Sequence, residues 1–277
     1  MTTAATGNIS TISDESLQGL KKLEKDGIVS LDAVYVSACE PSFQEPVIQF
    51  DNNQHNVVSL NLGTKRIRNI DITAFDHFPY LQTLNLGGTD LPVAEVMNIL
   101  AKVAPSIQHL FLGGLGLRDE GAIAVTQFLS SATQLIKIDL RYNDIGAAGL
   151  QGWPSLPNTL RFLYLEGNNL QDAGATTLAT LLESSNVEQV FLGANRIGPA
   201  GAQALAHILP HSQITKLYLE GNRIGIEGAE HFINALERDR SSIILQHLYA
   251  DNNDIGKESS KRLAKALNLE SMIDDAS

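Results

Sequence analysis

Apolar residues recur along most of the chain in one arrangement. Counting from a first apolar residue, further apolar residues stand at the fourth, sixth and eleventh places of each unit. Eight successive units follow this pattern, and they begin at Val57, Leu81, Ile107, Leu135, Leu160, Val187, Ile214 and Leu245. The starts lie 24 to 31 residues apart, a spacing typical of folds that are built from stacked repeats.

Each unit predicts a short strand followed by a helix. Side chains alternate between the two faces of a strand, so the fourth and sixth places point to one side and form a core. Beyond a turn, apolar residues follow at helical spacing, as in Gly201, Ala202, Leu205 and Leu209. The small Gly-Ala pair permits a close approach of the helix. We therefore expect an α/β solenoid shaped as a curved horseshoe, with parallel strands on the concave face and helices on the convex face.

Asparagine recurs at the ninth place of five units, in Asn143, Asn168, Asn195, Asn222 and Asn253. A side-chain amide there can bond backbone groups of the turn that leaves the strand, which a buried turn would otherwise leave unpaired. We predict a structural role for these residues.

Residues 1–56 lack the repeat. The stretch from about Asp14 to Glu24 predicts a helix, with Ser13 or Asp14 as its cap, and the apolar clusters Ile28 to Val36 and Val47 to Phe50 can add strands. We predict that this region is an N-terminal cap of the repeats.

Residues 57–277 are predicted to form the repeat domain, including a C-terminal capping helix. The fourth unit departs from the pattern, because Pro154 and Pro157 fall where its helix should run and shorten it. Trp153 is expected to fill the resulting gap, or alternatively to serve as an anchor on the convex side.

Charge and cysteine content narrow the classes of function. The net charge is -11 and the sequence pI is about 5.0, which disfavours nucleic acids and anionic membranes and favours a partner with a basic patch. Cys39 is the only cysteine of the sequence, so an intrachain disulfide is excluded and a reducing compartment is indicated. We expect a cytoplasmic monomer; an alternative is export without an N-terminal leader into a host cytosol.

Two segments of the sequence closely resemble the repeats of ribonuclease-inhibitor-like leucine-rich-repeat proteins: LYLEGNRIGIEGAEHFINAL and VFLGANRIGPAGAQALAHIL. The resemblance covers roughly residues 57–267. It implies a leucine-rich-repeat fold and protein binding on the concave strand face, on the strand-to-helix loops or on both. That subfamily includes inhibitors, immune sensors, the Ran GTPase activator, tropomodulin-like actin cappers and bacterial effectors, so the resemblance leaves the partner open.

The fifth place of each unit should face away from the core and report on binding. It holds, in order, Asn61, Asn85, Phe111, Asp139, Tyr164, Phe191, Tyr218 and Tyr249. Aromatic rings are favoured interface anchors, and a column of strands about 4.8 Å apart gives this row a length on the order of 25 Å. Large side chains at this place can equally serve the sheet itself, because neighbouring rings stack across strands.

Charged residues flank the aromatic row and complete the candidate binding surface. The most informative are Arg141, Glu166, Lys216, Glu220 and Asp251. The three acidic residues stand at the seventh place and make this half of the surface negative, which suits a basic patch on a partner.

Enzymatic chemistry has little support in the sequence. Nucleophile, base and metal-ligand patterns do not emerge from it, and we predict neither a catalytic residue nor a cofactor nor a metal site. A regulator of a small GTPase, similar to the Ran activator, is the alternative to a binding scaffold, with Lys65, Arg66 and Arg68 in an early loop as its candidate residues. A bacterial effector that binds a host protein is a further alternative.

Overall fold

The computed structural model describes residues 12–29, 48–53, 55–63 and 66–267, and the chain divides into two compact units. The first unit comprises Met1–Leu115 and Gln127–Asp139. The second comprises Gly116–Thr126 and Leu140–Ser277. Each unit is built from the repeats and is described by itself.

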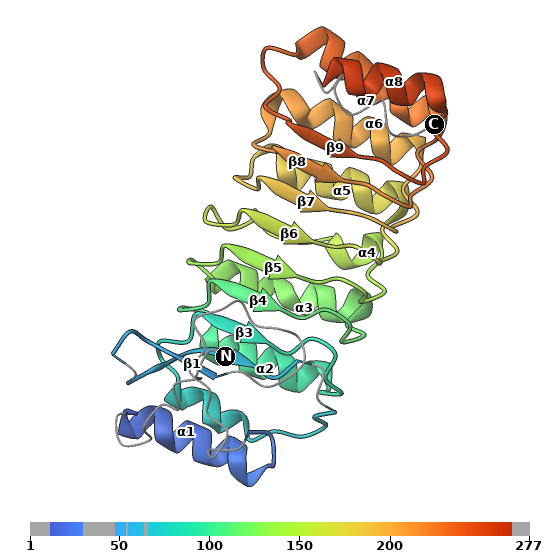
Figure 1. Ribbon diagram of the computed structural model, residues 1–277. Helices are drawn as coiled ribbons and strands as arrows, with labels where there is room; N and C mark the ends of the chain where they lie inside the picture. Colours follow the sequence, from blue (N-terminus) through green and yellow to red (C-terminus); the bar gives the residue numbers. More distant parts are fainter. Residues whose placement is uncertain (1–11, 30–47, 54, 64–65, 268–277) are drawn as a thin grey trace, which may run out of the picture. The chain divides into compact units, whose positions relative to one another are not determined.

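The first unit holds the strands of the first four repeats (Figure 1). Its strands are β1 (Ile48–Phe50), β2 (Val57–Asn61), β3 (Thr83–Asn85), β4 (His109–Phe111) and β5 (Lys137–Asp139). Its helices are α1 (Asp14–Lys25), the 3-10 helix η3 (Ile72–His77) and α2 (Val93–Val103). Strands β2 to β5 pair in parallel in chain order, whereas β1 runs antiparallel to β2.

The register of these strands confirms the predicted repeat. Leu60 pairs with Leu84, Leu84 with Leu110 and Leu110 with Ile138, so fourth places stand in line across the sheet. All four side chains are fully buried, and they form the core between strands and helices.

The cap region contains the predicted helix. In α1, the Ser13 hydroxyl accepts a hydrogen bond from the Ser16 amide at 3.2 Å, as expected for a helix cap. In the second cluster Ile48–Phe50 form β1 and Val47 lies outside the described residues, while Ile28 and Val29 are buried without being part of a strand. The rest of that first cluster, together with Cys39, lies outside the described residues, and the predicted boundary at residue 57 stays a prediction.

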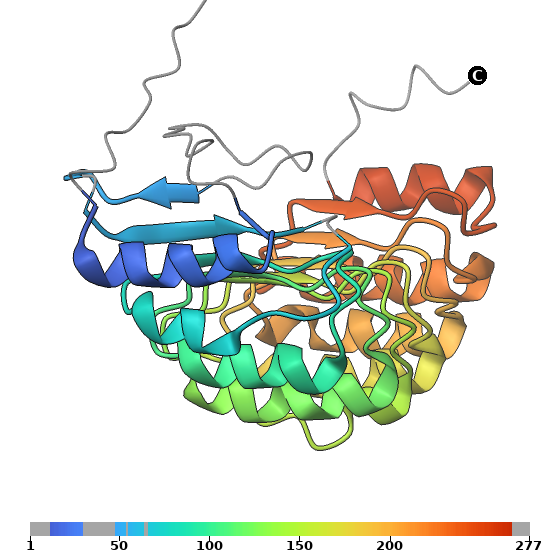
Figure 2. The same ribbon diagram turned by 90° about the horizontal axis from the view of Figure 1, so that it is seen from below.

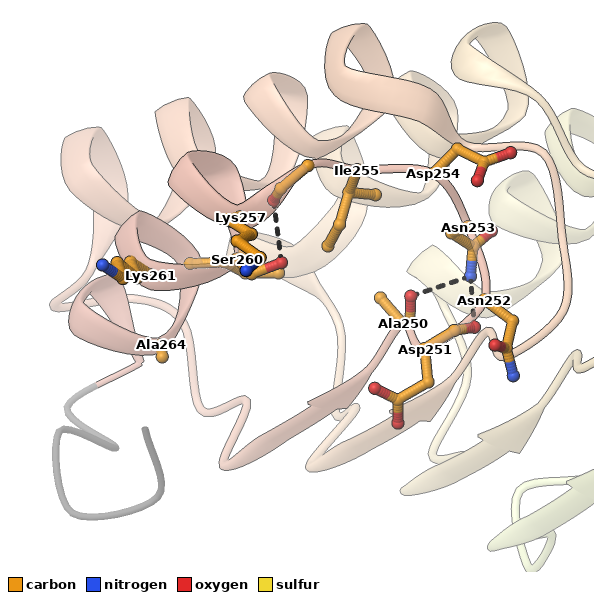
Figure 3. A pocket seen from close by; sticks show the side chains of 12 residues that line it. Ala250, Asp251, Asn252, Asn253, Asp254, Ile255, Lys257, Ser260, Lys261 and Ala264 are labelled. Atoms are coloured by element: carbon orange, nitrogen blue, oxygen red, sulfur yellow. Dashed lines mark hydrogen bonds between the residues drawn. The ribbon is translucent and has the colours of Figure 1, made fainter. Parts of the chain in front are cut away.

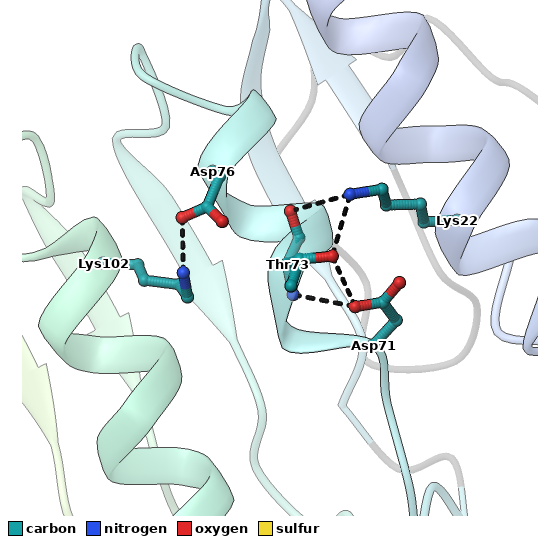
Figure 4. A network of polar contacts seen from close by, with 5 residues as sticks. All are labelled: Lys22, Asp71, Thr73, Asp76 and Lys102. Atoms are coloured by element: carbon teal, nitrogen blue, oxygen red, sulfur yellow. Dashed lines mark hydrogen bonds and ion pairs between the residues drawn. The ribbon is translucent and has the colours of Figure 1, made fainter.

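Polar contacts fasten α1 to η3 at the surface of the first unit (Figure 4). The Lys22 ammonium donates to the Thr73 hydroxyl at 2.8 Å, and that hydroxyl donates to Asp71 at 2.6 Å. The Thr73 hydroxyl and backbone amide both donate to the Asp71 carboxylate, and these two hydrogen bonds, together with the charge of Lys22, lower the pKa of Asp71. Nearby, Lys102 pairs with Asp76. Such exposed pairs contribute about 0 to 1 kcal/mol each.

The second unit contains the later repeats. Its strands are β6 (Phe162–Tyr164), β7 (Gln189–Phe191), β8 (Lys216–Tyr218) and β9 (His247–Tyr249), all parallel and paired in chain order. Its helices are α4 (Ala147–Leu150), α5 (Gln171–Glu183), α6 (Pro199–Ile208), η4 (Leu209–His211), α7 (Gly225–Asp239) and α8 (Lys257–Ala266). Helix α3 (Arg118–Ser131) begins in this unit and ends in the first. Figure 2 shows helices α5 to α7 covering one face of these strands.

The fourth repeat is shortened as the prolines predict. Helix α4 spans only four residues and ends before Pro154. Trp153 is 6% exposed, and its indole nitrogen donates to the Ala122 carbonyl at 3.0 Å. Its ring therefore fills the core beside the short helix, which contradicts the alternative of an exposed anchor.

The asparagines of the ninth place form a buried ladder, which confirms their structural role. The Asn195 amide donates to the carbonyls of Leu165 and Leu192, at 2.8 and 3.1 Å. The Asn222 side-chain oxygen in turn accepts from the Asn195 and Ile197 amides. All five asparagines are at most 6% exposed. Each thus links its own repeat to a neighbouring one and satisfies backbone groups that water cannot reach.

Two aspartates join consecutive helices. Asp119 accepts from the Gly146 and Gly149 amides, and Asp172 accepts in the same way from Gly198 and Gly201, at 2.7 and 2.8 Å. A Cβ atom on Gly201 would lie 2.8 Å from the Asp172 carboxylate, so the glycine is needed for this approach. Sequence reasoning foresaw the close approach at this glycine but missed the aspartates.

Candidate functional site

The strands of the second unit present one face that the helices do not cover, here called the strand face. In β6, β7 and β8 the central residue is buried, whereas the residues on either side of it are partly exposed. The third and fifth places therefore point away from the helices, as strand alternation requires. This face carries the predicted site residues of the second unit.

Four rings stand face to face along the strand face and form what we call the ring stack: Tyr164, Phe191, Tyr218 and Tyr249. Neighbouring centroids lie 4.1, 4.1 and 4.5 Å apart, with interplanar angles of 8°, 10° and 9°. Parallel strands in exact register bring the fifth places opposite one another, which confirms the expectation that these rings support the sheet. Each ring is nevertheless only partly buried, so the stack is also a continuous apolar strip at the surface.

Charged side chains border the ring stack. The guanidinium of Arg141 lies 5.3 Å from the centre of the Tyr164 ring, a cation-π contact. Arg161 and Glu188 form an ion pair at 3.2 Å. Lys216 lies on the strand face as the first residue of β8 and is partly exposed. Arg141 thus contacts the ring stack, and Lys216 lies on the same face.

The seventh places carry the acidic row, defined as Glu166, Glu220 and Asp251. Burial raises the pKa of Glu220, and the negative charges of Asp251 and Glu166 raise it further. Gly193 takes the seventh place between Glu166 and Glu220, where an added Cβ would lie 3.3 Å from Glu166 Cγ. The glycine thus lets the Glu166 side chain lean over the sixth repeat, and the carboxylates repel one another.

Phe111 belongs to the first unit and does not join the ring stack there. Its neighbour in register is Asp139, and the ammonium of Lys137 lies 5.7 Å from the centre of its ring. The other fifth places of the first unit are polar and buried, since Asn61, Asn85 and Asp139 are 3, 6 and 4% exposed. The fifth place, expected to face away from the core and report on binding, is therefore closed to solvent in these three repeats.

Tyr142 is an exposed aromatic residue that sequence reasoning missed. It occupies the eighth place of the fourth repeat, beside Arg141, and is 59% exposed. Its hydroxyl donates to the Glu166 carboxylate at 3.2 Å. A comparison of eighth places would have found it, because five of the other repeats have glycine or alanine there.

One comparison with known protein families supports the repeat assignment. A family model described as "Leucine Rich repeat" matches residues 133–152 and 157–179. The fold is a leucine-rich-repeat solenoid. None of the curated proteins matches the sequence.

Two solved structures are similar to parts of this leucine-rich-repeat chain. One is leiomodin-1 actin-binding site 2, with 24% identity and a TM-score of 0.31, covering 36% of this chain and 58% of that chain. The other is the tropomodulin C-terminal domain of Caenorhabditis elegans, with 15% identity and a TM-score of 0.41, covering 65% and 93%. The chain therefore spans little more than half of the leiomodin-1 structure.

A cavity of about 610 Å³ lies at the last leucine-rich repeat, between the loop after β9 and helix α8 (Figure 3). Ala250 stands here at the sixth place, where the other repeats have leucine. Asn253 bonds the carbonyls of Ala250 and Asp251 at 3.0 and 3.1 Å. Within the described residues β9 is the last strand of the sheet, so this hollow is the open end of a stack of repeats and not a shaped ligand site.

The early loop that would serve a GTPase regulator borders a polar pocket of about 340 Å³. Asp26, Arg66 and Arg68 are among the residues that line this pocket. Arg66 is exposed, and Arg68 lies 3.6 Å from Asp90. Lys65 lies outside the described residues. Over the described part of the leucine-rich-repeat chain, histidine, cysteine and acidic side chains do not cluster as metal ligands would, and the helices are too short or too polar to cross a membrane.

Proposed function

We propose that this protein is a non-enzymatic interaction module that binds a partner protein through the strand face of its second unit. The observation that carries the proposal is the ring stack beside the acidic row. Rings whose centroids lie 4.1 to 4.5 Å apart hold one another in place. Their side chains therefore lose little conformational entropy when a partner binds. Aromatic side chains contribute about 1.5 to 3 kcal/mol each when fully buried, so even partial burial of four rings supports a stable complex.

The charges define the chemistry of the partner. Glu166, Glu220 and Asp251 crowd together, and the raised pKa of Glu220 reflects its burial and this repulsion. A positively charged side chain placed among them relieves the repulsion, whereas an acidic one adds to it. The partner is thus a protein segment that combines apolar residues, for the rings, with arginine or lysine, for the acidic row. Arg141 and Lys216 fix its orientation.

Several finer points belong to the same proposal. We assign the repeats to the ribonuclease-inhibitor-like subfamily on the phrases quoted above, and we place the protein in the cytoplasm as a monomer. Phe111 is a separate contact candidate of the first unit.

Selection from a displayed library of random dodecapeptides tests the proposal. The whole chain is the bait, and enriched peptides are then synthesised and titrated by calorimetry. We expect enriched sequences to contain arginine or lysine together with apolar residues. The double variant Tyr164→Ala, Tyr218→Ala should weaken their binding by about a hundredfold, since each ring is worth at least one tenfold step.

A control variant matches the loss of apolar surface. Tyr80 and Ile123 are 57% and 46% exposed and lie outside the ring stack, so Tyr80→Ala, Ile123→Ala should bind as the parent does. Circular dichroism verifies that both double variants are folded. Acidic peptides, peptides that bind the Tyr164→Ala, Tyr218→Ala variant unchanged, or a selection without enrichment would each contradict the proposal.

A further inference from the structure

Tyr142 stands in a backbone conformation that suits glycine. Its φ is 55°, in the left-handed region where a side chain crowds the backbone and where a bulky residue is rare. The eighth place is left-handed in six other repeats, and these have small residues there: Gly88, Gly114, Gly167, Ala194, Gly221 and Asn252. The turn itself therefore does not require an aromatic ring.

The ring is held in position although it contributes little to the core. It is 59% exposed, and it lies against Gly167, where an added Cβ would come within 2.2 Å of Tyr142 Cδ1. Glycine at that position thus makes room for the ring. The hydroxyl donates to Glu166 at 3.2 Å, which ties the ring to the acidic row. A strained, oriented and solvent-exposed side chain is better explained by recognition than by folding.

We propose that Tyr142 is a recognition residue of the strand face and that its ring receives an arginine or lysine side chain of the partner. This inference rests on the proposed function and adds a specific contact to it. A cation over a tyrosine ring is attracted by the ring electrons, and the neighbouring Glu166 carboxylate adds to that attraction. The same surface already makes such a contact, because Arg141 lies 5.3 Å from the centre of the Tyr164 ring.

The test compares three variants of the whole chain, using the most enriched synthetic peptide from the selection above. Tyr142→Gly removes the ring and the strain together, Tyr142→Phe keeps the ring without the hydroxyl, and Tyr80→Ala removes an exposed tyrosine elsewhere. A second peptide carries norleucine in place of each arginine and lysine. Calorimetry gives the dissociation constants, and thermal unfolding gives the melting temperatures.

We expect Tyr142→Gly to weaken binding about tenfold, while its melting temperature stays level or rises by about 2 °C. Tyr142→Phe should retain most of the affinity, Tyr80→Ala should retain all of it, and the norleucine peptide should gain nothing from Tyr142. A contribution to binding with no contribution to stability distinguishes recognition from packing.

Each other result overturns the inference in a recognisable way. If Tyr142→Gly binds like the parent while Tyr164→Ala, Tyr218→Ala does not, Tyr142 is not a contact and the proposed function stands. A clear drop in the melting temperature of Tyr142→Gly would show that the ring is structural. If Tyr142→Gly weakens binding of the norleucine peptide as much as binding of the basic peptide, the ring makes an apolar contact. The proposed contact with arginine or lysine is then wrong. If neither set of substitutions matters, both proposals fail.

Discussion

The two units use the same repeat places for different purposes. In the first unit, Asn61 and Asn85 at the fifth place are buried and accept hydrogen bonds from the amides of Gly63 and Gly87, at 3.1 and 2.8 Å. In the second unit the fifth place carries the ring stack. The strands are of one kind and pair in one register, so the repeat does not dictate which of the two arrangements is used.

The seventh place explains how both arrangements fit. An added Cβ on Gly63 would lie 2.7 Å from the Asn85 side chain, so the buried Asn85 needs glycine at the seventh place of the preceding repeat. The second unit instead has carboxylates at most of its seventh places, and its fifth places are open to solvent. Asn61 and Asn85 of the first unit therefore bond the backbone of their own repeats, whereas the fifth places of the second unit hold the partly exposed ring stack.

The largest effect on stability is expected where the units differ inside the core, at the ninth place. Asn195→Ala should lower the free energy of unfolding by about 3 kcal/mol, because three buried carbonyls and one amide lose a partner. The second repeat has Thr89 there, whose hydroxyl donates a hydrogen bond to the Leu86 carbonyl at 2.8 Å. Thr89→Ala should therefore cost only about 1 kcal/mol. Urea denaturation measures both values, and equal losses would contradict the distinction.

The core of this fold could be predicted from the sequence because each core place is repeated. Apolar residues recur at the fourth and sixth places of all eight units and asparagine at the ninth place of five, and Pro154 and Pro157 mark the interrupted helix. The ring stack could be predicted for the same reason, since parallel strands in register bring fifth places together.

Features set by a single neighbour could not be predicted in this way. The buried Asn85 side chain has room only because Gly63, in the preceding repeat, has no Cβ. The position of the Tyr142 ring depends on Gly167, one repeat away, where an added Cβ would lie 2.2 Å from Tyr142 Cδ1. The division of the strands into two units likewise leaves no mark in the repeat pattern.

A smaller effect is expected at the acidic row. The pKa of Glu220 is raised in the folded chain, chiefly by burial, so the folded state holds this proton more tightly than the unfolded state does. Stability is therefore lost as pH rises from the ordinary glutamate value through the raised one. Glu220→Gln should raise the melting temperature at pH 7 by about 1 to 2 °C and should have no effect below the ordinary value.

The exposed Glu183 of α5 supplies the matched control, and Glu183→Gln should leave the melting temperature unchanged at both pH values. A lower melting temperature for Glu220→Gln at pH 7 would show that this carboxylate has a favourable partner within the chain. The charge of Glu220 would then already be compensated within the chain, and a basic partner residue would not be required to relieve repulsion in the acidic row.

Phe191→Asn tests the central claim most directly. This change places asparagine two residues before Gly193 and so recreates the arrangement of Asn85 and Gly87 in the middle of the ring stack. The measurement is the dissociation constant of the most enriched basic peptide, taken together with the circular dichroism spectrum. We predict a folded chain whose affinity falls at least tenfold. A folded variant that binds the peptide as tightly as the parent would contradict the claim that the ring stack is the binding surface.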